Sequence, residues 1–292
     1  MKRLFPLLAT LLLAACASPV AQQETPQQAL HNAATATSKL HSAKFDLGGV
    51  ISVQLPPQLV PGMNQEGANS LAPGLGQALA SGSITADLSG SGEAQFPDKL
   101  HATMNTRLGG LSVKTEEIVV GGKAYTKNPV TGQWSSGTAN GALGTGLSQP
   151  DPLSYAQLLD TAQSIKDLGD TTLNGVSVHH YQVVPDKAKL AAKLDSVPAF
   201  KDPQARQAFQ QILDKGTLTT QVWIGKSDHL LRRLLADAKL TIDLSQFMSG
   251  LSAGRGSQGL PQVPAGSTVT VMAHLTTNYH DFNSPVSIQA PA

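Results

Sequence analysis

Apolar side chains alternate with polar ones along much of this chain, and that pattern predicts β-strands. The clearest example is residues 236–244, in which alanine, leucine and isoleucine alternate with aspartate, lysine and threonine. Successive side chains of a strand point to opposite sides of a sheet, so such a strand has one dry face and one wet face. Strands are predicted in this way at residues 44–55, 83–96, 99–108, 111–120, 123–127, 176–184, 217–224, 230–244 and 268–282.

Four other segments have apolar residues three or four positions apart, which is the spacing of an amphipathic helix. Asp186 and Asp202 are placed to cap the N-termini of the last two, because an aspartate side chain can accept hydrogen bonds from the first free backbone N–H groups. Helices are predicted near residues 28–41, 152–168, 186–195 and 203–214.

Short turns join many of these strands, and helices do not alternate with strands in βαβ order. Gly109-Gly110 and Gly121-Gly122 are typical of two-residue hairpins between antiparallel strands. Two of the strands run to about fifteen residues, and long antiparallel strands twist and curl. We therefore expect an α+β fold in which a curled antiparallel β-sheet, a half-barrel, packs helices on its concave face.

Two stretches of more than twenty residues fit neither pattern. Residues 56–79 and 245–266 are rich in glycine, proline and serine, with scattered leucine, methionine and valine. Loops this long are usually either functional or disordered. They are interpreted as mobile insertions or as apolar flaps over the mouth of a cavity.

The N-terminal residues have the pattern of an export signal. Lys2 and Arg3 precede an apolar run at residues 4–13, which is too short to span a bilayer. The sequence Leu-Ala-Ala-Cys that ends at Cys16 resembles a bacterial lipobox, so Cys16 is expected to carry diacylglycerol and acyl chains such as palmitate. Two or three such chains hold a protein on a membrane almost permanently. The alternative is an ordinary secretory signal with a chance cysteine.

The expected organisation is therefore a signal peptide, a tether and one domain. Residues 1–15 would be removed, residues 16–27 form a polar, lipidated spacer, and residues 28–292 form a single domain outside the cytoplasmic membrane.

Charge and cysteine content exclude several other functions. The chain has 21 basic and 20 acidic residues, whereas nucleic-acid binding depends on clustered lysine and arginine. A single cysteine excludes an intramolecular disulfide and any site with several cysteine ligands.

One motif is typical of serine hydrolases. Residues 250–254 match G-x-S-x-G, in which the serine, here Ser252, must stand on a sharp turn from strand to helix. No helical pattern follows it. The single later carboxylate, Asp281, comes after His274 and His280, which is the wrong order for those hydrolases. A Ser252 hydrolase is kept as the weakest alternative.

Other catalytic and metal-binding motifs lack their context. Residues 254–259 match G-x-G-x-x-G, but prolines follow where a helix would be needed. No histidines have the H-E-x-x-H spacing, and His179 and His180 point to opposite faces of a strand. We expect no catalytic residue, no metal and no cofactor.

Several short phrases recur in an order that resembles a known family. They are His-Ser-Ala-Lys-Phe at 41–45, Val-Val-Gly-Gly-Lys-Ala-Tyr at 119–125, Gly-Gln-Trp at 132–134, Leu-Asn-Gly-Val at 173–176, Val-Trp-Ile at 222–224 and the segment at 279–291. Together with the lipobox and spacer, they resemble the actinobacterial LppX/LprG-type lipoproteins, which are related in fold to the LolA lipoprotein carriers. The resemblance implies a hydrophobic cavity for the acyl chains of lipids or lipoglycans, and the segments at 56–79 and 245–266 depart from it.

The resulting hypothesis is a lipid-anchored envelope protein that binds and transfers lipids without catalysis. We expect a monomer, with an envelope transporter as candidate partner. The alternative is a structural or ligand-binding lipoprotein with a fully packed core. The candidates for acyl contact are Leu159, Leu190, Leu218, Val222, Ile224, Leu240, Ile242, Leu244, Val269, Val271 and Leu275.

Overall fold

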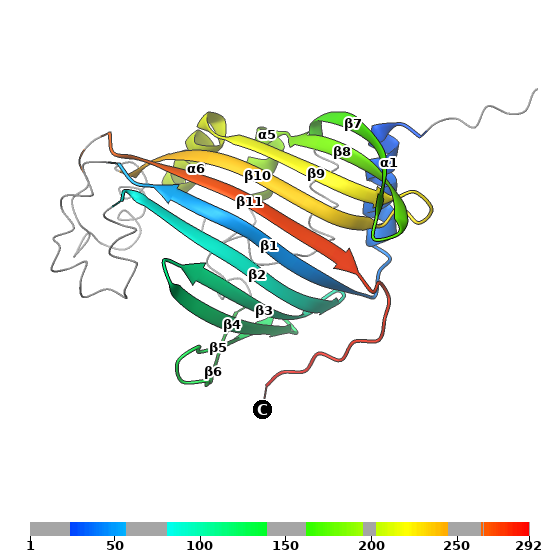
Figure 1. Cartoon of the computed structure of the whole chain (residues 1–292), viewed down its shortest axis with the longest axis horizontal. Helices are drawn as coiled ribbons and strands as arrows, with labels where there is room; N and C mark the ends of the chain where they lie inside the picture. The colour runs from blue at the N-terminus through cyan, green and yellow to red at the C-terminus, as the bar shows by residue number, and fades with distance from the viewer. Residues whose placement is uncertain are drawn as a thin grey trace, which may run out of the picture.

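A computed structural model describes residues 24–56, 81–138, 162–194, 203–244, 264 and 266–291. These ranges contain eleven strands and three helices, shown in Figure 1. The strands are β1 (Ser42–Gln54), β2 (Ser83–Gln95), β3 (Lys99–Leu108), β4 (Leu111–Val120), β5 (Lys123–Lys127), β6 (Trp134–Thr138), β7 (Ala162–Leu173), β8 (Val176–Pro185), β9 (Thr217–Gly225), β10 (Leu231–Asp243) and β11 (Thr268–His280). The helices are α1 (Pro26–Thr37), α5 (Lys187–Leu194) and α6 (Pro203–Lys215).

All eleven strands belong to one antiparallel sheet, which confirms the predicted fold class. Their order is β6-β5-β4-β3-β2-β1-β11-β10-β9-β8-β7, so the first and last strands of the chain pair at the centre. β1 and β11 run side by side from Lys44 opposite His280 to Gln54 opposite Thr270. The sheet is open, since β6 and β7 each have one unpaired edge in the described part of the chain.

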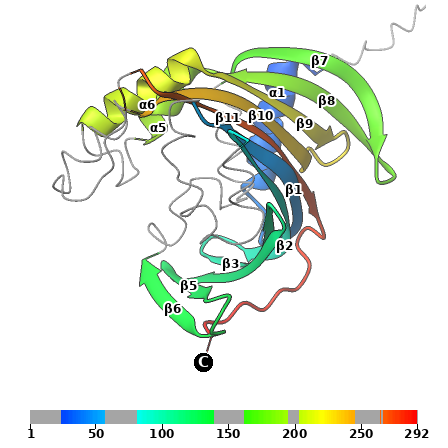
Figure 2. The ribbon, with the colours of Figure 1, turned by 60° about the vertical axis from the view of Figure 1, so that its left-hand side comes forward.

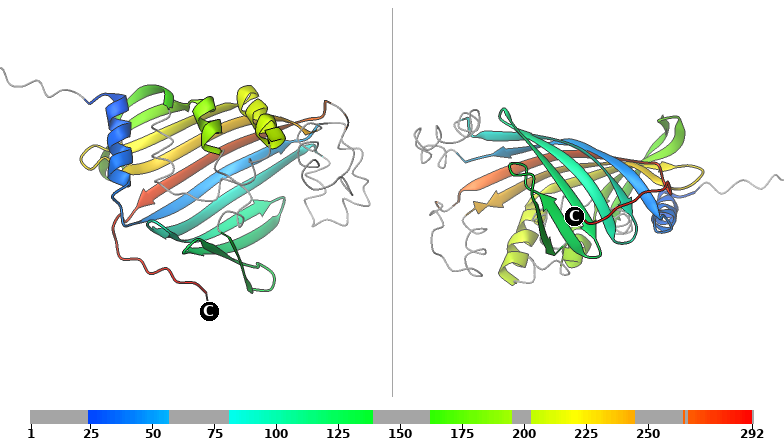
Figure 3. Two further views of the ribbon diagram at one scale, coloured as in Figure 1. Left: turned by 180° about the vertical axis from the view of Figure 1, so that it is seen from behind. Right: turned by 90° about the horizontal axis from the view of Figure 1, so that it is seen from below.

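The sheet is curled, and its helices lie on the concave side. Figure 2 shows the arc from β7 and β8 round to β5 and β6, and the rear view in Figure 3 shows α1, α5 and α6 in front of the same face. α1 packs against β7 and β9, and α6 packs against β10 and α5. The helices are thus concentrated over the half of the sheet formed by the later strands.

Helix α1 begins with a complete capping box. The backbone N–H of Gln28 donates to the Thr25 hydroxyl over 3.3 Å, and the backbone N–H of Thr25 donates to the Gln28 side chain over 2.9 Å. Pro26 occupies the first turn, where a missing N–H is tolerated. The helix buries Ala29, Leu30 and Ala33 against the sheet.

The buried core joins α1 to the concave face of the sheet. Its aromatic members are Phe45, Tyr181 and Tyr279, each at most 3% exposed. The remaining members are Ala29, Leu30, Ala33, Ala94, Leu100, Val119, Ala124, Val183, Val222, Ile224, Leu231 and Leu234.

The predicted helix at 152–168 was wrong in its second part. Residues 162–168 belong to β7, while residues 152–161 lie outside the described residues. The pairing of β7 with β8 shifts register between Ala162 and Ser164. A bulge adds one residue to a strand, so Ala162 and Ile165 both reach the core despite a helix-like spacing of three.

The other boundaries agree closely with the pattern of the sequence. β3, β4 and β5 have the predicted limits, α1 ends at Thr37, and β6 was not predicted as a strand. Asp186 caps α5, because its carboxylate accepts from the backbone N–H groups of Ala188 and Lys189 at 2.9 and 3.1 Å. Asp202 and most of the two long loops lie outside the described residues.

Substitution of Gly92 by alanine should destabilise the sheet. A Cβ atom there would lie 2.5 Å from Cζ of Phe45 and 2.5 Å from the carbonyl oxygen of His101. We expect Gly92→Ala to lower the free energy of unfolding by ~1–3 kcal/mol, because the Phe45 ring must move. Gly137→Ala is the control, since nothing lies within 4 Å of the added carbon. Equal urea denaturation midpoints for the two variants would contradict this packing.

Candidate functional site

The concave face is built from alternate residues of each strand, joined in rows across the sheet. In one row, Leu275 lies between Ala236 on β10 and Gly49 on β1, and Leu88 on β2 follows Gly49. α1 packs against the same face, because Phe45 and Tyr279 share it and belong to the core with Leu30. This apolar concave face is the candidate functional site.

The sequence-predicted contact residues on the sheet share this face. Leu244 directly follows β10, Leu190 is half-buried on α5, and Leu159 lies outside the described residues. The members on strands are Leu218, Val222 and Ile224 of β9, Leu240 and Ile242 of β10, and Val269, Val271 and Leu275 of β11.

Burial separates these candidates into two groups. Val222 and Ile224 are 0% exposed and Val269 is 5% exposed, so they are packing positions. Cδ2 of Leu240 lies 2.6 Å from where a Cβ of Gly216 would stand, so Leu240 packs closely against the residue between α6 and β9. Leu275 is half-buried between Gly49 and Ala236, and its Cδ2 lies 2.8 Å from where a Cβ of Gly49 would stand, so Leu275 covers Gly49 and keeps part of its own surface exposed.

Sequence reasoning missed the other half of the face, which β1 to β4 form. Leu47, Ile51, Leu88 and Met104 are half-buried there and point the same way as Leu275. Their signal was present, since the alternation in 44–55 and 99–108 predicted these strands. The two halves could not be joined from the sequence because the pairing of β1 with β11 spans the whole chain.

One acidic residue, Glu117, lies among the paired inward positions of β1 to β5 and β9 to β11. A single row runs from Tyr279 through Phe45, Gly92 and Ala102 to Glu117 on β4. Glu117 is 7% exposed, and no hydrogen bond or charge from a described residue contributes to its pKa. Burial raises the pKa of the Glu117 carboxyl to about 7, because removal from water disfavours its charged form. An acidic residue at an inward position of an alternating strand is the signal that could have identified it.

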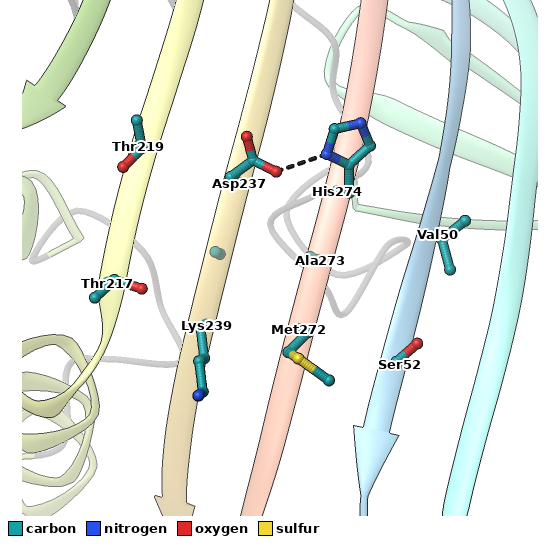
Figure 4. Close-up of a pocket in the computed structure, with 10 residues that line it drawn as sticks. Val50, Ser52, Thr217, Thr219, Asp237, Lys239, Met272, Ala273 and His274 are labelled. Carbon is teal, nitrogen blue, oxygen red and sulfur yellow. Dashed lines mark hydrogen bonds and ion pairs between the residues drawn. The ribbon is translucent and has the colours of Figure 1, made fainter.

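The opposite, convex face is polar. Glu116 accepts from Nζ of Lys127 at 3.0 Å and lies 3.1 Å from Nε2 of His101. An open hollow of about 370 Å³ lies on this face, and in it Nδ1 of His274 is 2.6 Å from Oδ1 of Asp237. Its lining, drawn in Figure 4, combines hydroxyl and ionisable side chains with valine, methionine and alanine.

The histidines and other candidate motifs do not combine into a chemical site among the described residues. Nδ1 of His179 lies 2.7 Å from Asp170, whereas the His180 ring stacks on Trp223 with centroids 4.1 Å apart. No group of three or more metal-ligating side chains is present in the described ranges. Ser252, residues 254–259 and Cys16 lie outside them. No described helix is long and apolar enough to cross a membrane.

Comparison with known proteins finds likeness in structure but not in sequence. No family model matches the chain, and no curated protein matches it. LprF from Mycobacterium bovis is 19% identical with a TM-score of 0.41, covering 91% of this chain and 96% of that one. The lipoprotein LppX from Mycobacterium tuberculosis is 15% identical with a TM-score of 0.41, covering 90% and 97%.

A LolA superfamily protein from Nitrosomonas europaea is more distant. It is 9% identical with a TM-score of 0.28, covering 90% of this chain and 94% of that one. At TM-scores below 0.5 these structures assign neither a ligand nor an activity to this chain.

Replacement of Glu117 by glutamine should stabilise the protein at neutral and alkaline pH. The folded pKa of about 7 lies above the ordinary value of 4.5, so wild-type stability falls as pH rises from 4.5 to 7. Glutamine cannot ionise, and Glu117→Gln should therefore raise the free energy of unfolding by up to ~3 kcal/mol above pH 7. Urea titrations of both proteins at pH 4 and pH 8 measure this, and a difference that does not grow with pH contradicts it.

Glu116→Gln is the matched control and should act in the opposite direction. The hydrogen bond from Lys127 holds the pKa of Glu116 below its usual range, so this carboxylate stabilises the fold above its ordinary pKa. That contribution is lost as pH falls through the folded pKa. We expect Glu116→Gln to cost under ~1 kcal/mol at pH 8, as for other pairs near the surface.

Proposed function

We propose that this chain is a membrane-anchored, extracytoplasmic lipoprotein that binds lipids or lipoglycans on the concave face and transfers them. The observation that carries this proposal is the composition of that face. Across the paired positions of β1 to β5 and β9 to β11, its inward side chains are apolar, small or hydroxyl-bearing, with Glu117 as the one charged group.

An apolar surface of this kind suits acyl chains. Each methylene group that leaves water contributes about 0.8 kcal/mol, so a long chain binds firmly without any directional contact. Half-buried residues such as Leu88, Met104 and Leu275 keep exposed apolar surface that a ligand could cover. Binding and transfer need no catalytic residue.

The N-terminal sequence supports attachment to a membrane. Cys16 ends the lipobox-like motif, and the nine residues 17–25 separate it from α1, which begins at Pro26. Acyl chains on Cys16 would hold the domain close to the bilayer. In this proposal the protein acts as a monomer and exchanges ligand with the membrane or with an envelope transporter.

The Leu275→Trp variant tests the proposal directly. Leu275 is half-buried on the concave face, so in this proposal an indole in its place extends from the exposed side of the residue into the place of the ligand. We expect uptake of a fluorescent fatty alcohol to fall at least about tenfold, while the free energy of unfolding changes by under ~1 kcal/mol. Val222→Trp is the control, since it overpacks a residue that is 0% exposed and should cost ~1–3 kcal/mol.

A packed structural lipoprotein would behave differently in the same experiment. Wild-type protein would then take up no fluorescent lipid, and native mass spectrometry would find no co-purified lipid. Leu275→Trp would lose stability as Val222→Trp does. That set of results would remove the lipid-binding proposal.

Attachment through Cys16 is tested by Cys16→Ser expressed in a bacterial host. Serine cannot form the thioether to diacylglycerol, so the variant should move from the membrane fraction to the soluble fraction. It should also lose metabolic labelling by palmitate. Retention of label or of membrane association by Cys16→Ser would contradict the lipobox interpretation.

A further inference from the structure

We propose that the carboxyl group of Glu117 binds the head group of the ligand, and that this head group is a hydrogen-bond donor, either a hydroxyl or an amine. The inference rests on the proposed function, since it places the head group on the face that would hold the acyl chains. It adds the chemical class of the polar end.

The neighbours of Glu117 within the sheet are small or apolar. It pairs with Ala102 on β3 and with Thr126 on β5, and the next inward residue of its own strand is Val119. The residue is 7% exposed, so its carboxyl group is removed from bulk water. A side chain at this place needs a partner inside the protein or in a ligand.

The described residues supply no such partner. No hydrogen bond or ion pair reaches Glu117 from them, whereas the adjacent Glu116 on the convex face is paired with both Lys127 and His101. An ionised carboxylate without a donor is costly to bury. The raised pKa of Glu117 is consistent with this cost, since burial is its cause. A donor on a bound molecule would remove the cost.

The negative charge of Glu117 determines which head groups can bind beside it. Glu117 is the one charged side chain at the paired inward positions of β1 to β5 and β9 to β11. No lysine or arginine stands at those positions to neutralise a phosphate or carboxylate. An anionic head group would therefore be repelled, whereas a hydroxyl or ammonium group would donate to Glu117.

The surrounding face offers a path for the acyl chain. Met104 on the neighbouring strand β3 lies in the next inward row of the sheet from Glu117. Leu88 lies on the following strand, β2, and in the row after that of Met104. Leu275 lies in the row of Leu88. From strand spacing and rise, Glu117 and Leu275 are roughly 20 Å apart along the sheet. The path is lined by half-buried apolar side chains.

Displacement of a fluorescent dye by three matched amphiphiles tests the inference. Full-length protein, freed of co-purified lipid on a hydrophobic resin, is loaded with N-phenyl-1-naphthylamine at pH 8. Dodecylamine, dodecanol and dodecanoate are then titrated. We expect the amine and the alcohol to displace the dye at about tenfold lower concentration than dodecanoate, as charge-assisted hydrogen bonding and repulsion predict.

In Glu117→Gln the preference for dodecylamine over dodecanoate should shrink about tenfold, because the amide carries no charge. Glu116→Gln removes the same charge from the convex face and should keep the wild-type preference. A wild-type preference in Glu117→Gln, with all three amphiphiles still bound, overturns the role of Glu117 and leaves lipid binding intact. Failure of the wild type to bind dye or dodecanol overturns the proposed function instead.

A measurement on the wild-type protein tests the inference even if Glu117→Gln fails to fold. The carboxyl carbon of Glu117, followed by ¹³C NMR, should titrate at lower pH when dodecylamine is bound, since an ammonium group stabilises the carboxylate. Dodecanoate should not lower this midpoint. An unchanged midpoint in saturating dodecylamine overturns the inference.

Discussion

The pairing of β1 with β11 is the interaction on which the rest of the structure depends. It joins the meander of β2 to β6 to the strands β7 to β10, which otherwise share no edge. The junction is closed at one end by contacts between distant residues. The Asn283 side chain accepts from the backbone N–H of His41 at 2.8 Å, and the Ser42 hydroxyl donates to the carbonyl of Ser284 at 2.6 Å.

Continuous antiparallel pairing then imposes the two faces. The side chains of paired residues lie on the same face of a sheet. The orientation of each residue of β1 therefore determines the face on which its partners on β2 and β11 lie. A shift of one residue would turn Phe45 and Tyr279 out of the core together. The curl of the sheet makes one of the two faces concave, and the buried side of α1 completes the core there. The polar convex face carries ion pairs such as Glu116 with Lys127 and Asp237 with His274.

Much of this architecture follows from local pattern. Strands β3 to β5 were predicted to the residue, because clean alternation and the glycine pairs at 109–110 and 121–122 are both local signals. β7 was missed because its bulge gives a helical spacing, and β6 because its five residues carry little pattern. The distinction between fully buried and half-buried apolar positions could not be predicted, since Val222 and Leu275 are both apolar residues at inward positions of a strand and differ only in burial.

Glu117 illustrates a second limit of sequence reasoning. The preceding residue, Glu116, is also a glutamate. Because side chains alternate along a strand, Glu116 points to the polar face and Glu117 to the apolar face. The consequence is two opposite pKa shifts in consecutive residues. Such a residue marks where an otherwise apolar surface can recognise a polar group.

The central claim is that acyl chains lie on the concave face. Photolabelling with a diazirine-bearing fatty alcohol, followed by mass-spectrometric mapping of the labelled residues, tests it most directly. The account predicts labels on inward positions such as Met104, Leu88 and Leu275, with competition by unlabelled dodecanol. Labels confined to the hollow beside Asp237 and His274 on the convex face, or no label above that of unfolded protein, would contradict it.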